Sequence, residues 1–332
     1  MSGERTLTDI FRRLIATTGP ISLAHYMAEA NARYYAKPDP FGAGGDFITA
    51  PEISQMFGEL AGLWLADMWD RAGRPQPAYY VELGPGRGTL AVDALRAMGA
   101  AGLTPSAHLV ETSPVLRARQ AERLPDALWH DGIGTLPSDR PLLIVANEFF
   151  DALPIRQMIG SRERRVAIGD DGSFQPDPAT SAEITEDSPA SRAVAQDLAS
   201  RLARQGGVLI VIDYGYAGPA QGDTLQAVAR HQPVAPFAAP GEADLTAHVD
   251  FTALGLAAAN GGAMVAGPVP QGRWLRALGI DSRAAALSAA APSRATEVAA
   301  AVARLTGADA MGELFQVMAL AAPGWPMPEG VR

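Results

Sequence analysis

The stretch VELGPGRGTL, residues 81–90, decides how the rest of this chain is interpreted. An apolar run leads through an acid, Glu82, into three glycines at alternate positions, Gly84, Gly86 and Gly88, and then into a predicted helix. Glycine has no Cβ atom, so its backbone approaches a ligand closely and readily takes positive φ angles. The stretch therefore indicates a strand-to-helix turn. The glycines either hold a small molecule or only allow a tight turn that binds nothing.

Two phosphate-binding motifs do not fit this turn. A P-loop requires a lysine directly after its last glycine, and no lysine lies near Gly88. A dinucleotide fingerprint requires the spacing G-x-G-x-x-G, which would put a glycine where the sequence has Thr89. What remains is an acid followed by alternating glycines, so the neighbouring strands have to identify the ligand.

Short apolar runs alternate with helical segments along most of the chain. This alternation predicts a parallel sheet covered on both faces by helices, which is an α/β fold. The expected strands are residues 79–83, 107–110, 128–130, 142–146 and 208–212, with two more near 263–266 and 314–320. Helices are expected between the first strands, at 89–98 and 114–123.

Polar residues stand at the ends of successive expected strands, where ligands of open α/β sheets bind. Glu111 lies 23 residues after Gly88, close to the roughly 20 expected of an acid on a ribose diol, and Asp131 is placed to face an adenine edge. A nucleoside with a cationic tail and no phosphates meets these requirements. We therefore predict S-adenosylmethionine as the cofactor and S-adenosylhomocysteine as its product. The expected binding residues at the turn and strand ends are Glu82, Gly84, Pro85, Gly86, Gly88, Glu111, Asp131 and Asn147.

The composition excludes several classes of function. The chain has 332 residues, 48% of them hydrophobic, with a formal net charge of −9 and no cysteine. The acidic balance argues against a general nucleic-acid binder, and the missing cysteines exclude disulfides, thiolate metal sites and a cysteine nucleophile; we expect no metal. No apolar run reaches the roughly 18 residues of a membrane span, and the N-terminus has no apolar signal core. We therefore expect no membrane insertion and a bacterial cytoplasmic location.

Six segments together resemble the MidA family of class I methyltransferases: GDFITAPEISQMFGELAGLW, VELGPGRGTL, HLVETSPVLRARQ, NEFFDALPIRQ, VIDYG and PGEADLTAHVDF. The resemblance covers nearly all of residues 5–255 and leaves 270–312 poorly matched. Mitochondrial members of this family assist the assembly of respiratory complex I by methylating an arginine of a quinone-site subunit. The resemblance thus implies a protein substrate, a complex I subunit or its bacterial equivalent, and it allows a homodimer.

The same resemblance implies the architecture. It predicts a Rossmann-like core with a seven-stranded, mostly parallel sheet, a helical N-terminal extension and helical insertions. We expect the extension and a lid loop in residues 1–75, and the methyltransferase core in 76–332. Insertions are expected at about 156–206 and 270–312, and DDGSFQPD in the first of them predicts a hairpin that precedes a helix.

Four residues are candidates for holding or activating the acceptor. An arginine keeps its charge at neutral pH because its pKa exceeds about 12, so it must be held by carboxylates that accept its N–H donors. Glu148 and Asp151, just past the fourth strand, are the candidate pair; alternatively, one of them caps the next helix or pairs with Arg156. Asp213, at the end of the fifth strand, and His248 are the other catalytic candidates, each with a structural alternative.

The segment 37–52, rich in glycine and proline, is either a stiff connector or a lid that excludes water. The resemblance favours the lid, with Phe47 and Thr49 closing over the cofactor. The TAPE sequence at its end matches the S/T-x-x-E capping box of a helix N-terminus. From a later loop, Asp244 and Thr246 are further candidates for reaching the site.

Three other functions stay open at the level of sequence. A small-molecule methyltransferase would use the same cofactor turn, and an assembly factor could bind the cofactor without turnover. A nicotinamide dehydrogenase is disfavoured by Thr89 in the glycine-rich turn. The acceptor is the least constrained part of the prediction, because a fold and a cofactor motif do not name it.

Overall fold

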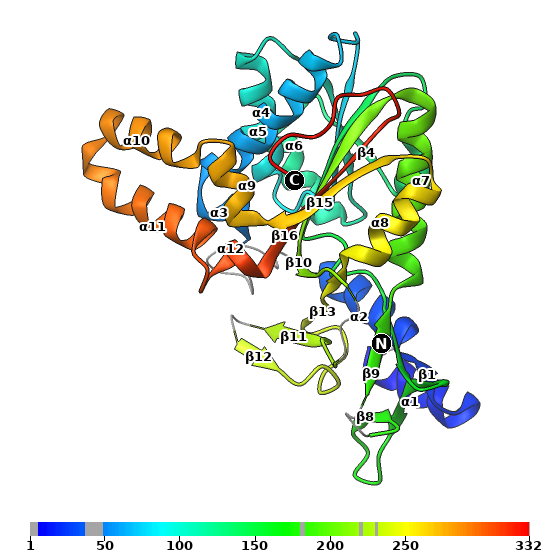
Figure 1. Cartoon of the computed structure of the whole chain (residues 1–332). Helices are drawn as coiled ribbons and strands as arrows, with labels where there is room; N and C mark the ends of the chain where they lie inside the picture. The colour runs from blue at the N-terminus through cyan, green and yellow to red at the C-terminus, as the bar shows by residue number, and fades with distance from the viewer. Residues whose placement is uncertain (1–5, 37–48, 180–182, 219–221, 230–231, 332) are drawn as a thin grey trace.

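The computed structural model describes residues 6–36, 49–179, 183–218, 222–229 and 232–331 (Figure 1). Its centre is a seven-stranded sheet, with the short β14 (Val249–Asp250) beside the end of one strand. In spatial order the seven are β4 (Leu128–His130), β3 (Ser106–Val110), β2 (Tyr79–Leu83), β5 (Leu142–Asn147), β10 (Gly207–Tyr216), β16 (Phe315–Ala321) and β15 (Met264–Pro270). The first five pair in parallel, and β16 runs antiparallel between β10 and β15. The predicted fold class is confirmed, and these strands lie where the sequence indicated them.

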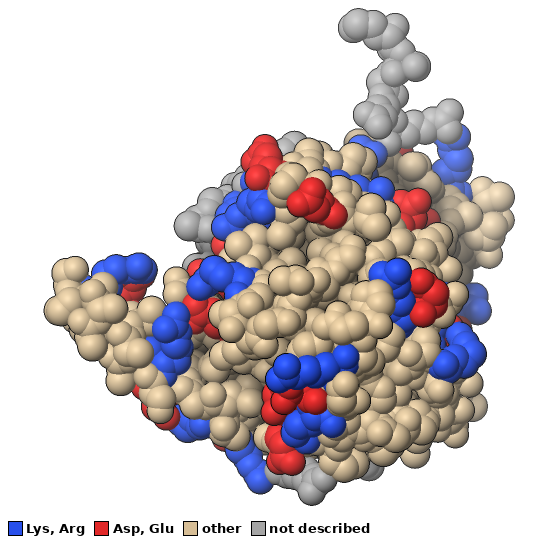
Figure 2. Space-filling view, turned by 90° about the horizontal axis from the view of Figure 1, so that it is seen from above, with Lys and Arg blue, Asp and Glu red and all other residues tan. Residues whose placement is uncertain are grey.

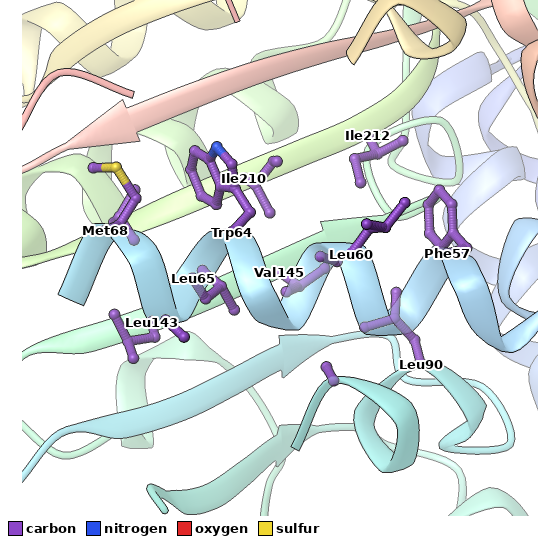
Figure 3. Packing of buried hydrophobic residues seen from close by; sticks show 14 of the residues in the cluster. Phe57, Leu60, Trp64, Leu65, Met68, Leu90, Leu143, Val145, Ile210 and Ile212 are labelled. Atoms are coloured by element: carbon purple, nitrogen blue, oxygen red, sulfur yellow. The ribbon is translucent and has the colours of Figure 1, made fainter. Parts of the chain in front are cut away.

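Both faces of the sheet are buried, because apolar side chains follow one another along the strands. In β5, Leu143 and Val145 belong to one core, whereas Leu142 and Ile144 belong to the core on the opposite face. Helices α4 (Gln55–Arg71) and α5 (Thr89–Ala100) cover the first face, and α7 (Pro189–Gln205) and α8 (Phe251–Asn260) cover the second. Trp64 of α4 lies against the strands of the first face (Figure 3). In the described part of the chain, no helix combines the length and apolarity that a membrane span requires.

A smaller core lies outside the central sheet, and we call the elements around it the outer unit. These are α1 (Leu7–Thr18), β1 (Ile21–Ser22), α2 (Leu23–Tyr35), β6 (Arg156–Ile159), β7 (Arg162–Ile168), β8 (Phe174–Asp177), β9 (Ile184–Asp187), β11 (Gln226–Ala229), β12 (Gln232–Val234) and β13 (Asp244–Thr246). The rings of Phe11, Tyr26 and Phe174 pack at its centre, with centroids between 5.0 and 6.2 Å apart. In Figure 1 the outer unit lies beyond the end of β10. It therefore stands over the edge of the sheet where ligands are expected.

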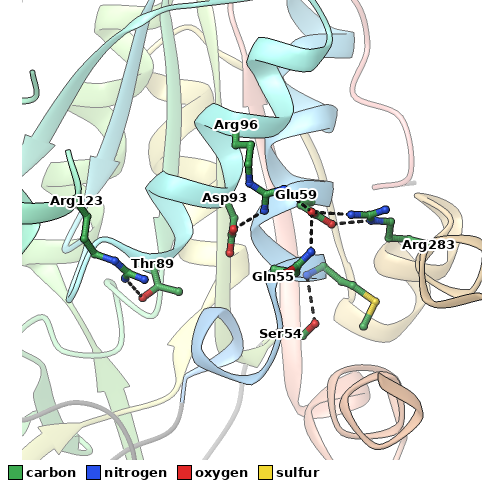
Figure 4. A network of polar contacts seen from close by, with 9 residues as sticks. Ser54, Gln55, Glu59, Thr89, Asp93, Arg96, Arg123 and Arg283 are labelled. Atoms are coloured by element: carbon green, nitrogen blue, oxygen red, sulfur yellow. Dashed lines mark hydrogen bonds and ion pairs between the residues drawn. The ribbon is translucent and has the colours of Figure 1, made fainter. Parts of the chain in front are cut away.

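A helical arm connects β15 to β16 and stands away from the body of the molecule in both overall views (Figures 1 and 2). It consists of α9 (Gln271–Ala277), α10 (Ile280–Ala290), α11 (Ala295–Thr306) and α12 (Met311–Leu314). The arm joins the body through buried side chains of the first core, among them Trp274, Leu275 and Leu305. The buried carboxylate of Glu59 on α4 adds two hydrogen bonds of 2.8 Å from Arg283 of the arm, and it also accepts one of 3.0 Å from Arg96 of α5 (Figure 4). On the face seen in Figure 2, basic and acidic side chains lie interspersed.

Some segments pack with a different part of the molecule than the expected domain boundaries imply. Helix α4 falls within the expected extension and α7 within the expected first insertion, yet both bury their apolar stripes against the central sheet. The rest of that insertion, residues 156–187, is mainly antiparallel strands of the outer unit, including the predicted hairpin as β7 and β8. The second insertion is helical as expected.

The expected capping box is wrong. Helix α3 (Ala50–Ile53) has only four residues, and the side chain of Thr49 does not cap it. The Glu52 carboxylate instead accepts a 2.6 Å hydrogen bond from the hydroxyl of Thr89, at the start of α5. A new helix, α4, begins at Gln55 with Ser54 as its N-cap.

The contact between α4 and α5 generates a stability prediction. Gly62 faces α5 so closely that an added Cβ would lie 2.6 Å from the Cα of Ala94. We expect Gly62→Ala to lower the free energy of unfolding by roughly 1–3 kcal/mol, because the helices would have to separate. Gly99→Ala is the matched control: it lies in the same helix pair with open space around it, and it should stabilise by about 0.5–1 kcal/mol. Denaturant unfolding of both variants measures these changes. If Gly62→Ala stabilised the protein as much as Gly99→Ala, the close packing of the two helices would be contradicted.

Candidate active site

A cavity of about 610 Å³ opens at the carboxyl ends of the central strands. Cavities of this size hold small ligands and cofactors. Its walls come from the glycine-rich turn, from the segments that follow β3, β4 and β5, from α2 and β13 of the outer unit, and from the start of α3. Of the residues expected to bind or act, it is lined by Thr49, Glu82, Gly84, Pro85, Gly86, Glu111, Asp131, Asn147, Glu148 and Asp151.

The glycine-rich turn has the conformation that its sequence predicts. Gly84, Gly86 and Gly88 have φ values of +61°, +53° and +76°, in a region that L-residues rarely adopt. Gly84 and Gly86 line the cavity with their backbone, and Gln120 fixes the turn by donating a 2.7 Å hydrogen bond to the carbonyl of Gly86. Gly88 does not line the cavity: it is the left-handed N-cap of α5 and lies against Gln120. Its role is therefore in the turn.

Glu82 is a buried acid on the floor of the cavity. It is 3% exposed, and the hydroxyl of Tyr80 donates a 2.6 Å hydrogen bond to its carboxylate. Burial raises the pKa of Glu82 to about 8, although the Tyr80 bond acts in the opposite direction. A positively charged ligand group beside Glu82 would favour the ionised form and would be attracted by it.

Glu111 and Asp131 follow adjacent strands and differ in environment. Glu111 is buried and accepts a 2.7 Å hydrogen bond from the backbone N–H of Ser113; burial raises its pKa and this bond opposes the shift. The side chain of Asp131 is 84% exposed and pairs with Arg117 at 2.6 Å, while Arg117 also donates to the carbonyl of Glu111. Glu111 thus lies inside the cavity, and Asp131 forms its rim.

The residues after β5 bring polar atoms into the cavity. Asn147 and Asp151 are buried, and the Oδ1 atom of each has no hydrogen-bond partner among the described residues. Glu148 has a φ of +49°, which is uncommon outside glycine and clusters at functional sites. Its carboxylate accepts a 3.4 Å hydrogen bond from the N–H of Ala50, next to Thr49. The described end of the expected lid therefore contacts this segment, whereas Phe47 lies outside the described residues.

Two of the expected catalytic residues do not line the cavity. Asp213 is fully buried, and one of its oxygens accepts the backbone N–H groups of residues 149–151 at 3.2, 2.9 and 3.3 Å. It therefore holds the loop that carries Glu148 and Asp151. His248 donates its backbone N–H to Thr224 and packs its ring on Tyr214, 5.6 Å between centroids. The structure places both residues behind the wall of the site.

The outer unit supplies cavity residues that the sequence motifs indicate weakly or not at all. Tyr35, Asp244 and Thr246 line the cavity opposite the β5 loop, together with Asn31, which no motif identified. The available signal was an asparagine on the apolar face of a helix, since Asn31 lies four residues after Met27 and three before Tyr34. In the structure Asn31 is only 6% exposed. A buried amide requires hydrogen-bond partners, so it marks a contact between segments.

The carboxylates after β5 make a pH-dependent prediction. Burial raises the pKa of Glu148 to about 8, with the charge of Asp151 as the next cause, and burial raises the pKa of Asp151 to about 6. A carboxyl whose folded pKa is raised contributes stability that is lost as the pH rises through that pKa, at about 1.4 kcal/mol for each tenfold change in its acid dissociation constant. In cofactor-free protein, Glu148→Gln should therefore be more stable than wild type at pH 9, with the difference shrinking towards pH 5.

Denaturant unfolding between pH 5 and 9 measures this difference. Glu242→Gln, an exposed residue that does not line the cavity, controls for the loss of one negative charge. A stability difference for Glu148→Gln that does not change with pH would contradict the raised pKa.

Comparison with known proteins identifies the family and its cofactor. A family model described as "Putative S-adenosyl-L-methionine-dependent methyltransferase" matches residues 60–269. The protein arginine methyltransferase NDUFAF7 homolog of Drosophila melanogaster is 35% identical over 96% of this chain and 85% of its own length. The zebrafish (Danio rerio) protein arginine methyltransferase NDUFAF7 is 38% identical over 91% and 83%.

A solved structure supports the same family assignment. A protein from Burkholderia thailandensis, crystallised with S-adenosyl-homocysteine, superimposes with a TM-score of 0.87 and 31% identity, over 98% of this chain and 94% of that one. This chain thus shares its overall fold with a relative whose structure contains S-adenosyl-homocysteine. The chain belongs to this family of S-adenosylmethionine-dependent methyltransferases, which confirms the resemblance drawn from its motifs.

Proposed function

We propose that the protein transfers a methyl group from S-adenosylmethionine to an arginine side chain of another protein. Two lines of support converge. Relatives at 34–38% identity carry the name protein arginine methyltransferase, and the cavity has an acidic wall, Glu148 and Asp151, suited to a cationic acceptor. The Oδ1 atom of buried Asp151 carries most weight: it has no hydrogen-bond partner among the described residues, although the Tyr214 hydroxyl bonds the same carboxyl group, and a buried acceptor atom is normally hydrogen-bonded.

The residues of the cavity fit the cofactor. The backbone of Gly84 and Gly86 leaves room for a nucleoside, Glu111 would accept the ribose hydroxyls, and Asp131 would face the adenine from the rim. Glu82 would attract the positively charged end of the methionyl group. When bound, the cofactor supplies an electrophilic methyl group on a sulfonium, whose sulfur leaves with the bonding electron pair.

The acceptor chemistry then falls to the loop after β5. Glu148 and Asp151 would hold the planar guanidinium and leave one nitrogen facing the methyl group, since positioning and electrostatic stabilisation dominate such transfers. As the new N–C bond forms, that nitrogen loses a proton. Glu148 is the base that would take it: burial raises its pKa to about 8 in the empty site, and the adjacent guanidinium would favour its ionised form. Asp213 keeps both carboxylates in place through the backbone of residues 149–151.

The identity of the protein substrate rests on the family resemblance. We propose a subunit of respiratory complex I or its bacterial equivalent, methylated during assembly of the complex. The net charge of −9 favours encounter with a basic partner surface. The homodimer remains a prediction.

The ribose contact gives a prediction about the cofactor. We expect Glu111→Gln to weaken S-adenosylmethionine binding at least several-fold, because each hydrogen bond to a charged acceptor contributes roughly 1.5–3 kcal/mol. Calorimetry with the wild-type protein and the variant measures the change. Asp131→Asn is the matched comparison, and it should have a smaller effect because Asp131 is largely exposed. Equal dissociation constants for wild type and Glu111→Gln would remove Glu111 from the cofactor site.

The acceptor assignment is tested by methyl transfer. We expect wild-type protein to transfer labelled methyl groups to arginine in protein extract from cells that lack this gene. Glu148→Gln should lower the rate of transfer at least tenfold while the S-adenosylmethionine dissociation constant stays within about twofold, because the lost contact belongs to the transfer step. Mass spectrometry identifies the modified residue. Label on a lysine, a carboxylate or a small molecule would sink the arginine assignment and leave the cofactor assignment intact.

A further inference from the structure

A third carboxylate faces the acceptor side of the cavity from a different part of the chain. Asp244 opens β13 in the outer unit, lines the cavity and is 6% exposed. The hydroxyl of Tyr35 on α2, another lining residue, donates a 2.8 Å hydrogen bond to one oxygen of Asp244. This bond orients the carboxylate, so Asp244 has a defined position at the wall of the cavity.

Asn31 ties β13 to the loop that carries the first two carboxylates. Its side-chain amide donates to the carbonyl of Ala152 at 3.0 Å and to the carbonyl of Leu245 at 2.8 Å, and its oxygen accepts the N–H of Leu245 at 3.0 Å. The N–H of Ala247 also donates to the carbonyl of Asp151 at 3.0 Å. Asp151 and Asp244 are therefore held at a fixed separation by hydrogen bonds through backbone next to each of them.

The carboxylates are close enough to influence one another. After burial, the charges of Asp244 and Asp151 are the next causes that raise the pKa of Tyr35, and both charges also raise the pKa of Glu148. Buried like charges of this kind are costly unless a cation joins them. Asp151 and Asn147 are both more than nine-tenths buried and line the cavity, and the Oδ1 atom of each finds no hydrogen-bond donor among the residues that the structure describes. This independently indicates that a ligand supplies a donor.

We propose that Asp244, oriented by Tyr35, is a third acceptor-binding carboxylate that makes the site selective for a guanidinium over an ammonium group. This rests on the proposed function and adds a specificity residue to it. A guanidinium presents five N–H donors spread around a plane, whereas an ammonium presents three on one atom. Carboxylates from two separate segments, the β5 loop and β13, can surround a planar group. A compact ammonium, with its three donors on one atom, matches such a planar arrangement less well.

Asp244→Asn is the direct test, because the amide keeps an oxygen for the Tyr35 hydroxyl and loses only the charge. With methyl acceptor supplied as graded amounts of extract from cells lacking the gene, we expect the half-saturating concentration to rise at least tenfold. The dissociation constant for S-adenosylmethionine and the melting temperature should change little, which separates lost acceptor binding from misfolding. Tyr35→Phe should give a smaller rise in the same quantity.

Glu242→Gln is the matched control, since it removes a charge two residues away from an exposed side chain that does not line the cavity. Glu242→Gln should leave the half-saturating concentration of the acceptor extract unchanged. If Asp244→Asn also leaves it unchanged, or if Glu242→Gln shifts it equally, Asp244 does not bind the acceptor and the proposal fails.

A binding measurement keeps this result distinct from failure of the proposed function. If wild-type protein methylates no arginine in the extract, the proposed function fails, and the site is then probed with N-acetyl-arginine amide and N-acetyl-lysine amide in the presence of S-adenosylhomocysteine. Wild-type protein should bind the arginine probe at least tenfold more tightly, and Asp244→Asn should lose most of that preference. Equal binding of the two probes by wild type would overturn the selectivity.

Discussion

The carboxylate of Asp213 fixes the geometry on which the site depends. Three consecutive N–H groups, those of residues 149–151, converge on one of its oxygens, and the other accepts the N–H of Tyr214. A buried carboxylate is costly unless several donors satisfy it. The loop after β5 is therefore bound to the end of β10, and the positive φ of Glu148 is maintained inside that constraint. Together with the hydrogen bonds from Asn31 to Ala152 and from Ala247 to Asp151, this anchor orients the two acidic side chains of the loop.

The sequence is sufficient to predict the central sheet and the cofactor turn, for identifiable reasons. Apolar runs such as Leu142–Ala146 are short and fully apolar, as strands buried on both faces must be. The alternating glycines can be interpreted locally because a positive φ is a property of single residues. Glu111 is identifiable from its spacing alone, since the length of a strand–helix–strand unit varies little.

The outer unit and its contribution to the site could not be predicted in the same way. Asn31 and Leu245 are separated by more than two hundred residues and meet only through the packing of α2 against β13. No local pattern encodes such a meeting. His248 illustrates the converse difficulty: a histidine in a loop with candidate site residues suggests catalysis, whereas the ring packs on Tyr214 and does not line the cavity. Asp213 lies at the strand end where the sequence predicts it, but the direction of its carboxylate, towards backbone N–H groups, depends on the three-dimensional path of the next loop.

The position of β16 has a consequence for how this molecule is made. The ribosome completes β15 before β16, yet β15 has no place in the sheet until β16 inserts between it and β10. Throughout synthesis of the helical arm, β10 presents an unpaired edge, and β15 has no strand beside it. Exposed edges of this kind favour pairing with other chains. The arm lengthens that interval by more than forty residues of translation, so these edges stay open to such pairing until the arm has been translated.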